Sequence, residues 1–162
     1  MKLNIYFGCA LAFGPKEYKL EIASIKKKLS NLPWIQLFEF CTPPSGQLQS
    51  DLTPEIIYET DIITGVGSAH VVLGDLSYPS TGLGGELGIA MREHKVRTMM
   101  FARKKIKNAD GEEEDTIVSK LWIGAPAHNP HASFVWYERN IEEVFEKIVS
   151  DLKEEYEKLI CK

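Results

Sequence analysis

The chain has 162 residues, 44% of them hydrophobic, which is enough apolar material for the core of one domain. Its net charge of −4 and its isoelectric point near 5.6 argue against a protein that binds a nucleic-acid backbone through a basic face. The three cysteines form neither a C-x-x-C pair nor a disulfide framework, and no apolar stretch approaches the length of a membrane span. We therefore expect a single cytoplasmic domain over residues 1–162 that binds neither nucleic acid nor a membrane.

Strands and helices alternate in the first part of the chain. The apolar spacing predicts a strand over Lys2–Phe7, a helix over Lys16–Leu32 and a second strand over Trp34–Phe40. The prolines, glycine and serines of Cys41–Thr53 are typical of a surface loop. A second helix is expected over Pro54–Val66, with the threonine before it as the N-cap and the proline in its first position.

The stretch Val71–Ala90 combines a buried strand, a glycine-rich turn and a helix. An apolar run, His70–Leu76, predicts the strand, Ser77–Gly85 contains three glycines, and helical spacing begins at Glu86. Glu86 would then lie in the first turn of a helix at the carboxyl end of a parallel strand, where open α/β sheets bind small ligands. We expect the helix dipole to lower the pKa of this carboxyl, so that it acts ionised, as a nucleophile or a cation stabiliser. The dinucleotide fingerprint G-x-G-x-x-G is absent, because Leu87 stands where a glycine is needed.

The second half continues the alternation. Strands are expected over Arg97–Ala102 and Ala132–Tyr137, and helices over Thr116–Ile123 and Asn140–Ile160. The highly charged segment Arg103–Asp115 has little to bury and predicts a mobile surface loop. The whole pattern predicts an α/β fold, a doubly wound five-stranded parallel sheet in a flavodoxin-like three-layer sandwich.

Several charged residues are candidates for chemistry from their positions alone. Glu86 has an alternative explanation, because carboxylates are common at the start of helices. Asp61 lies late in a predicted helix, where its charge opposes the dipole, and Glu59 is the alternative on the same helix. Asp75, at the end of the central strand, is a further candidate acid or metal ligand. The four histidines share no metal-ligand spacing with cysteines or acidic residues, so no metal is expected.

The segment Pro79–Gly88, PSTGLGGELG, resembles the signature of the nucleoside 2-deoxyribosyltransferase superfamily. Within that superfamily it is most similar to the 2'-deoxynucleoside 5'-phosphate N-hydrolases, and weaker likeness extends over Ile56–Asp61, Ser119–Ala125 and Val135–Tyr137. The resemblance implies cleavage of the base–sugar bond of a 2'-deoxynucleoside or its 5'-monophosphate, without a cofactor. The sugar would pass through a covalent ester with a glutamate, as in a retaining glycosidase.

The resemblance also assigns roles to individual residues. Glu86 would attack C1', Asp61 would orient it or manage the proton on the base, and Tyr6 would position it. The residues implied to bind the substrate are Gly8, Ser80, Gly82, Gly84 and Ser119. Ser119 corresponds to a residue that the partner subunit lends to the neighbouring site, which implies a homodimer.

The sequence departs from the family in the loop after the first strand. Ala10 and Ala12 lie roughly where the phosphohydrolases carry a serine and an arginine on the phosphate, although Lys16 could supply a charge. Phe40 replaces a histidine near the base, and the spacing from Asp61 to the glutamate is one residue longer. A deoxyribosyltransferase and a non-catalytic nucleotide- or flavin-binding module therefore remain alternatives to the hydrolase.

Overall fold

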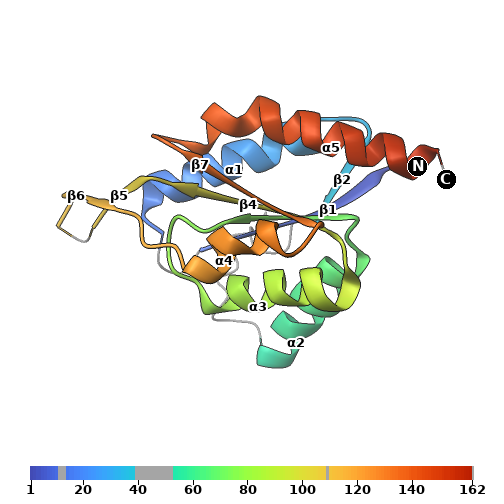
Figure 1. Ribbon diagram of the computed structural model, residues 1–162, viewed down its shortest axis with the longest axis horizontal. Coiled ribbons are helices and arrows are strands. Elements are labelled where there is room, and N and C mark those ends of the chain that lie inside the picture. The colour runs from blue at the N-terminus through green and yellow to red at the C-terminus, as the bar shows by residue number, and fades with distance from the viewer. Residues whose placement is uncertain (11–13, 39–52, 109, 162) are drawn as a thin grey trace.

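A five-stranded, all-parallel sheet forms the centre of the protein, in a computed structural model that describes residues 1–10, 14–38, 53–108 and 110–161 (Figure 1). The strands lie in the order β2-β1-β3-β4-β7, which confirms the expected flavodoxin-like α/β fold. Their bounds are β1 (Leu3–Cys9), β2 (Ile35–Phe38), β3 (Val71–Asp75), β4 (Arg97–Arg103) and β7 (Ala132–Tyr137). Residues 41–52 of the loop expected over Cys41–Thr53, and the end of the second expected strand, lie outside the described residues.

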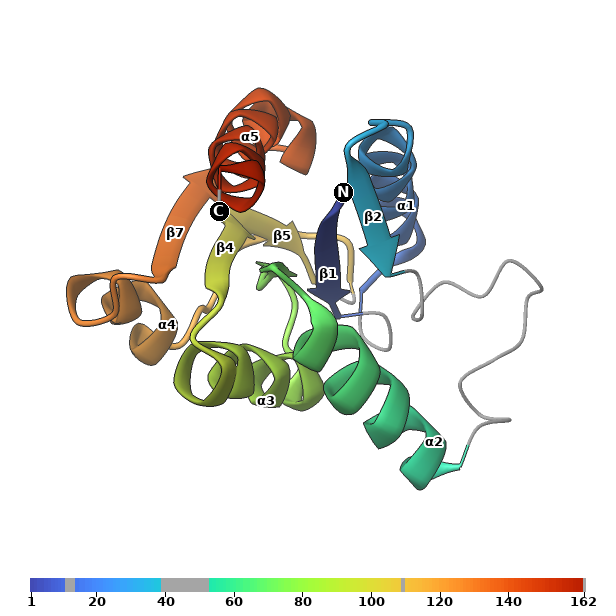
Figure 2. The same ribbon diagram turned by 90° about the vertical axis from the view of Figure 1, so that its right-hand side faces the viewer.

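Helices cover both faces of the sheet (Figures 1 and 2). The helices on one face are α1 (Lys16–Ser30) and α5 (Phe145–Ile160), the latter preceded by a short 3₁₀ segment, η5 (Ile141–Val144). Those on the other face are α2 (Pro54–Tyr58), α3 (Thr81–Ile89) and α4 (Lys120–Gly124), followed respectively by η2 (Glu59–Val66), η3 (Ala90–His94) and η4 (Ala125–Ala127). Because side chains of a strand alternate between faces, Phe7 packs beneath α1 and α5, whereas Tyr6 packs beneath η2 and α3.

The helix that leads into β3 changes its winding halfway along. It begins as expected, with Thr53 as the N-cap that accepts a hydrogen bond from the Ile56 N–H and with Pro54 in the first position. From Glu59 to Val66 it is a π-helix, in which backbone bonds run from residue i to i+5. The predicted extent, Pro54–Val66, is therefore confirmed, but its geometry is only partly α-helical.

The start of α3 differs from the expectation. The helix begins at Thr81 and not at Glu86, because the Ser80 hydroxyl caps it by accepting a hydrogen bond from the Leu83 N–H at 3.2 Å. The three glycines that predict a turn are thus inside the helix. Glu86 consequently lies in the second helical turn.

The charged segment Arg103–Asp115 is not the expected loop. It contains a two-stranded antiparallel hairpin of β5 (Lys105–Lys107) and β6 (Glu113–Asp115). The Asn108 side chain accepts hydrogen bonds from the N–H groups of Asp110 and Glu112 between the two strands.

In the described part of the chain, no helix is long and apolar enough to cross a membrane.

Candidate functional site

The Glu86 side chain lies at the carboxyl edge of the sheet, directly over Gly8 of β1. A Cβ at Gly8 would stand only 2.6 Å from Glu86 Oε2 and 2.6 Å from Leu83 Cδ1. A Cβ at Gly82 would stand 3.8 Å from Glu86 Oε1. Glu86 is 9% exposed, so its side chain is largely enclosed by the protein.

Tyr6 supports Glu86 from the same strand that carries Gly8. Hydrogen bonding from its hydroxyl favours the ionised carboxylate and so lowers the pKa of Glu86, and the residue is 2% exposed. A Cβ at Gly65 would stand 2.6 Å from the Tyr6 ring, so the glycine lets the η2 backbone lie against the ring. The aromatic residue is therefore held between β1 and η2.

Asp61 brings a second carboxylate to Glu86. It is 6% exposed on η2, and its charge raises the pKa of Glu86, whereas Glu59 on the same helix is exposed. The structure thus brings together Glu86, Asp61 and Tyr6, the three residues expected to be catalytic. The π-helical winding begins two residues before Asp61 and continues beyond it. Because a π-turn holds more residues than an α-turn, this segment can accommodate the one-residue-longer spacing noted in the sequence.

Burial dominates the titration of Glu86. Desolvation, followed by the negative charge of Asp61, raises its pKa from 4.5 to about 7, and the Tyr6 hydrogen bond and the Lys26 charge only partly oppose this shift. The expectation of a lowered pKa is therefore wrong. The dipole acts mainly within the first turn of a helix, and Glu86 lies beyond that turn in a desolvated position.

Lys26, on the opposite face of the sheet, is a residue that the sequence analysis missed and whose charge acts on this site. It is 3% exposed on α1, with its ammonium 5.5 Å from the centre of the Phe7 ring, and its charge lowers the pKa of Glu86. Its signal was in the helical spacing, since it lies four residues after the buried Ile22 and three before the buried Leu29.

The expected substrate-binding residues of α3 divide into two groups. Ser80 and Gly82 lie at the helix start, where the first amide N–H groups of a helix have no partner within it. The Ser80 hydroxyl oxygen accepts the Leu83 N–H, which leaves its own hydrogen able to donate. Gly84 instead faces α4, because a Cβ there would stand 3.7 Å from Trp122.

The remaining expected residues lie elsewhere. Ser119 is exposed and caps α4 by accepting the Leu121 N–H, and Lys16 is exposed at the start of α1. Ala10 is packed in the core beneath α1, while Ala12 and Phe40 fall outside the described residues. Within the described part, no group of three or more His, Cys, Asp or Glu side chains could hold a metal ion.

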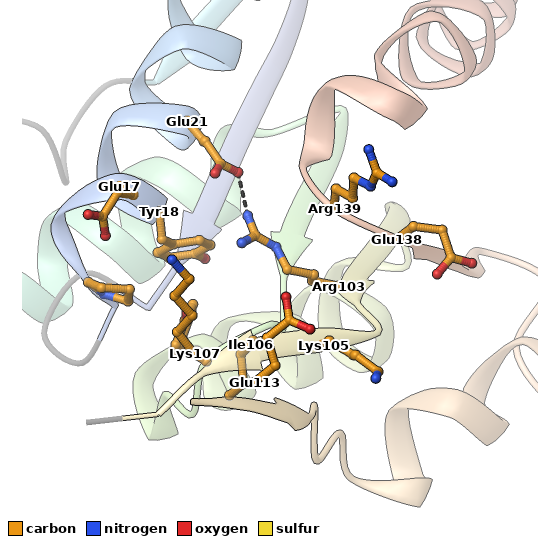
Figure 3. A pocket seen from close by; sticks show the side chains of 12 residues that line it. Glu17, Tyr18, Glu21, Arg103, Lys105, Ile106, Lys107, Glu113, Glu138 and Arg139 are labelled. Atoms are coloured by element: carbon orange, nitrogen blue, oxygen red, sulfur yellow. Dashed lines mark hydrogen bonds and ion pairs between the residues drawn. The ribbon is translucent and has the colours of Figure 1, made fainter. Parts of the chain in front are cut away.

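A separate hollow of about 570 Å³ opens on the other face of the sheet (Figure 3). Its lining comes from α1, the turn after β3, the end of β4, the β5–β6 hairpin and the segment after β7. Arg103 projects into it and forms an ion pair with Glu21. Asp75, the alternative acid, is fully buried on this face beneath Tyr18, so it belongs to this side and not to the Glu86 site.

Comparison with known proteins gives a likeness at the level of fold. No protein-family model and no curated protein matches the chain. Among solved structures, the chain is similar to the CMP N-glycosidase BcmB of Clostridium botulinum, with a TM-score of 0.60, 12% sequence identity and coverage of 90% of this chain and 96% of that chain. At this level of identity, the two proteins share a fold.

Proposed function

We propose that the protein is an N-glycosidase that cleaves the base–sugar bond of a 2'-deoxynucleoside or its 5'-monophosphate. The observation that carries this proposal is the enclosed Glu86 carboxylate, seated over Gly8 with Tyr6 and Asp61 around it. The resemblance of Pro79–Gly88 to the deoxyribosyltransferase signature and the fold shared with a CMP N-glycosidase both support it.

The reaction would proceed by double displacement at C1'. A Glu86 oxygen bonds to C1' as the C1'–N bond breaks, and the electrons of that bond leave with the base. Asp61 passes one proton to the departing base. Water then attacks C1', returns a proton to Asp61, and releases the free sugar and the Glu86 carboxylate.

The start of α3 would bind the 5' end of the substrate. The Ser80 hydroxyl and the unpaired amides of the first helical turn suit an anion, and the dipole favours negative charge there. Lys16, exposed at the start of α1, could add a charge. Ser119 would come from the partner subunit of a homodimer.

The activity is tested by incubating the protein with 2'-deoxynucleosides and their 5'-monophosphates and following the free base by chromatography. CMP belongs in the panel because the structural neighbour acts on this ribonucleotide. Release of free base supports the proposal, and no release from any substrate contradicts it. Adding a second base distinguishes the two reactions, because a transferase would form a new nucleoside with it.

The nucleophile is tested by Glu86→Gln against a matched carboxylate on the same face, Glu59→Gln. Loss of the nucleophile is expected to lower kcat on the order of a thousandfold. Glu59 is exposed, so its substitution is expected to leave kcat within about twofold. Equal rates for wild type and Glu86→Gln would show that another residue attacks C1'.

A non-catalytic nucleotide-binding protein is the second candidate. The observation that favours it is Ala10, which is packed in the core where the similar hydrolases carry a polar residue on the phosphate. Calorimetric binding of a nucleotide that is never cleaved would support this candidate over the enzyme.

A further inference from the structure

Asp75 is fully buried at the carboxyl end of β3, and three donors meet its carboxylate. The Tyr18 hydroxyl donates to Oδ1 at 3.0 Å, the Tyr137 hydroxyl donates to Oδ2 at 2.8 Å, and the Ser77 N–H donates to Oδ1 at 3.0 Å. The donors come from α1, from β7 and from the turn after β3. This one side chain therefore joins three elements of the fold.

Ser77 extends the network to β4. Its hydroxyl lies 2.9 Å from the Tyr137 hydroxyl and accepts the Arg103 N–H at 2.9 Å. The preceding residue, Leu76, donates its N–H to the Phe101 carbonyl at 2.8 Å. The two residues after β3, Leu76 and Ser77, are thus fixed by hydrogen bonds to β4, to Tyr137 of β7 and to Asp75.

A carboxylate buried in this position costs free energy of folding. Burial raises the pKa of Asp75, so its hydrogen bonds do not fully compensate for the lost hydration. Apolar residues of similar volume often stabilise a protein more than buried charges do. The network is therefore better explained by the placement of the turn than by stability.

The turn ends at Ser80, only three residues beyond Ser77. Ser80 caps α3 and begins the helix start to which the proposed function assigns the 5'-phosphate. Glu86 has its own supports, because Gly8 and Tyr6 of β1 contact it directly. A displacement of the turn is thus expected to affect binding at the 5' end of the substrate more than the position of Glu86.

We propose that Asp75 is a positioning residue that, through Ser77 and Tyr137, sets the Ser77–Ser80 turn and so determines affinity for the 5'-phosphate. This role rests on the proposed N-glycosidase function and deepens it. Asp75 itself touches no substrate, since it is enclosed on the opposite face of the sheet.

The test compares Ser77→Ala and Tyr137→Phe with Thr98→Val. Thr98 is also fully buried, and its hydroxyl bonds to the Val96 carbonyl at the amino edge of the sheet. Each variant removes one buried hydroxyl and is expected to lower the melting temperature by a similar few degrees. KM and kcat are measured for the monophosphate that wild type cleaves fastest and for the corresponding nucleoside.

Ser77→Ala and Tyr137→Phe are expected to raise KM for the monophosphate roughly three- to tenfold, the worth of one net hydrogen bond. KM for the nucleoside and kcat are expected to stay within about twofold of wild type. The midpoint of the pH profile is expected to move by no more than a few tenths of a pH unit. Thr98→Val is expected to change none of these. The positioning role of Asp75 is overturned if KM for the monophosphate is unchanged or if KM for the nucleoside rises equally. It is also overturned if Thr98→Val raises KM for the monophosphate to the same extent.

Calorimetry with 2-deoxyribose 5-phosphate separates this proposal from the proposed function. If wild type cleaves no substrate, the N-glycosidase is wrong, and the binding of this sugar phosphate decides the role of the turn. Weaker binding in Ser77→Ala and Tyr137→Phe, with wild-type binding in Thr98→Val, supports it. Equal binding in all variants, or no binding by wild type, overturns it.

Discussion

At the scale of single residues, the candidate site depends on glycines, whose lack of a side chain leaves space for other residues. Gly8 leaves the space into which Glu86 folds, and Gly65 leaves the space for the Tyr6 ring. Two glycines on different elements thus allow a carboxylate and its aromatic support to pack against backbone. The sequence singles out Gly8 but not Gly65, and it does not show which side chain fills the space at either.

Gly8→Ala is expected to lower kcat by about tenfold or more while the fold is retained. The added Cβ would overlap the carboxylate oxygen and Leu83, so Glu86 must move, and displacements of this size are costly in catalysis. The control is Gly85→Ala, where a Cβ would meet nothing within 4 Å and a helical alanine stabilises by about 1 kcal/mol. Steady-state kinetics and thermal melts of both variants check this, and a Gly8→Ala enzyme with wild-type kcat would contradict it.

The raised pKa of Glu86 predicts how activity and stability depend on pH. A nucleophile must be ionised, so kcat is expected to rise with pH through about 7. The free energy of unfolding is expected to change in the opposite direction, because the pKa of Glu86 is higher in the folded state than in the unfolded state. The protonated carboxyl favours the folded state fully below pH 4.5, and this stabilisation is lost as pH rises through about 7.

Glu86→Gln is therefore expected to be inactive and yet more stable than wild type above pH 7. The pKa shift corresponds to a gain in stability of about 3 kcal/mol at most, which would raise the melting temperature by several degrees. This gain is expected to disappear near pH 4.5. Thermal melts across this pH range measure it. A Glu86→Gln protein that melts below wild type at pH 8 would mean that the carboxylate is net stabilising.

At the scale of elements, the sequence predicts most helices and strands but misjudges the glycine-rich and charged stretches. The glycines of Ser77–Gly85 point to a turn, yet the Ser80 cap and tertiary packing carry the helix through them. The charge of Arg103–Asp115 points to a solvated loop. The change from basic to acidic was itself the useful signal, because Lys105 pairs with Asp115 and Lys107 with Glu113 across the hairpin.

The π-helix η2 offers a prediction at this scale. Deleting Ile63, which is 60% exposed, is expected to convert the segment to an α-helix and rotate Asp61 by about 100° relative to Gly65. Asp61 would then leave Glu86, which lowers the pKa of Glu86 and moves the acid limb of the activity profile to lower pH. Ile63→Ala, which keeps the length, is the control, and an unshifted profile in the deletion variant would show that the extra residue does not place Asp61.

At the scale of the whole molecule, the alternation of strands and helices is sufficient to predict the parallel sheet. It also places the functional residues at the carboxyl edge, because turns after parallel strands meet there. What it does not give is the face on which each residue lies. Asp75 and Glu86 are both acids near the end of β3, but the sheet separates them, since Asp75 bonds to Tyr18 of α1 and Glu86 to Tyr6.

The expected homodimer gives a prediction at the same scale. If Ser119 completes the partner's site, Glu86→Gln and Ser119→Ala are each expected to be impaired alone. A mixture of the two, unfolded and refolded together, would contain hybrids in which one site has both native residues. Recovery of activity in the mixture, with a dimer in analytical ultracentrifugation, supports a shared site, and a monomer or a mixture no more active than its components contradicts it.

A carboxyl that titrates near neutral pH makes the protein exchange protons with its surroundings whenever a ligand alters its charge state. A cationic mimic of the sugar at C1' would favour the ionised form of Glu86 and so release up to one proton into solution at neutral pH. The apparent heat of binding would then depend on the ionisation enthalpy of the buffer, phosphate giving a different value from Tris. Glu86→Gln would abolish that dependence, so calorimetry in two buffers would count the proton directly.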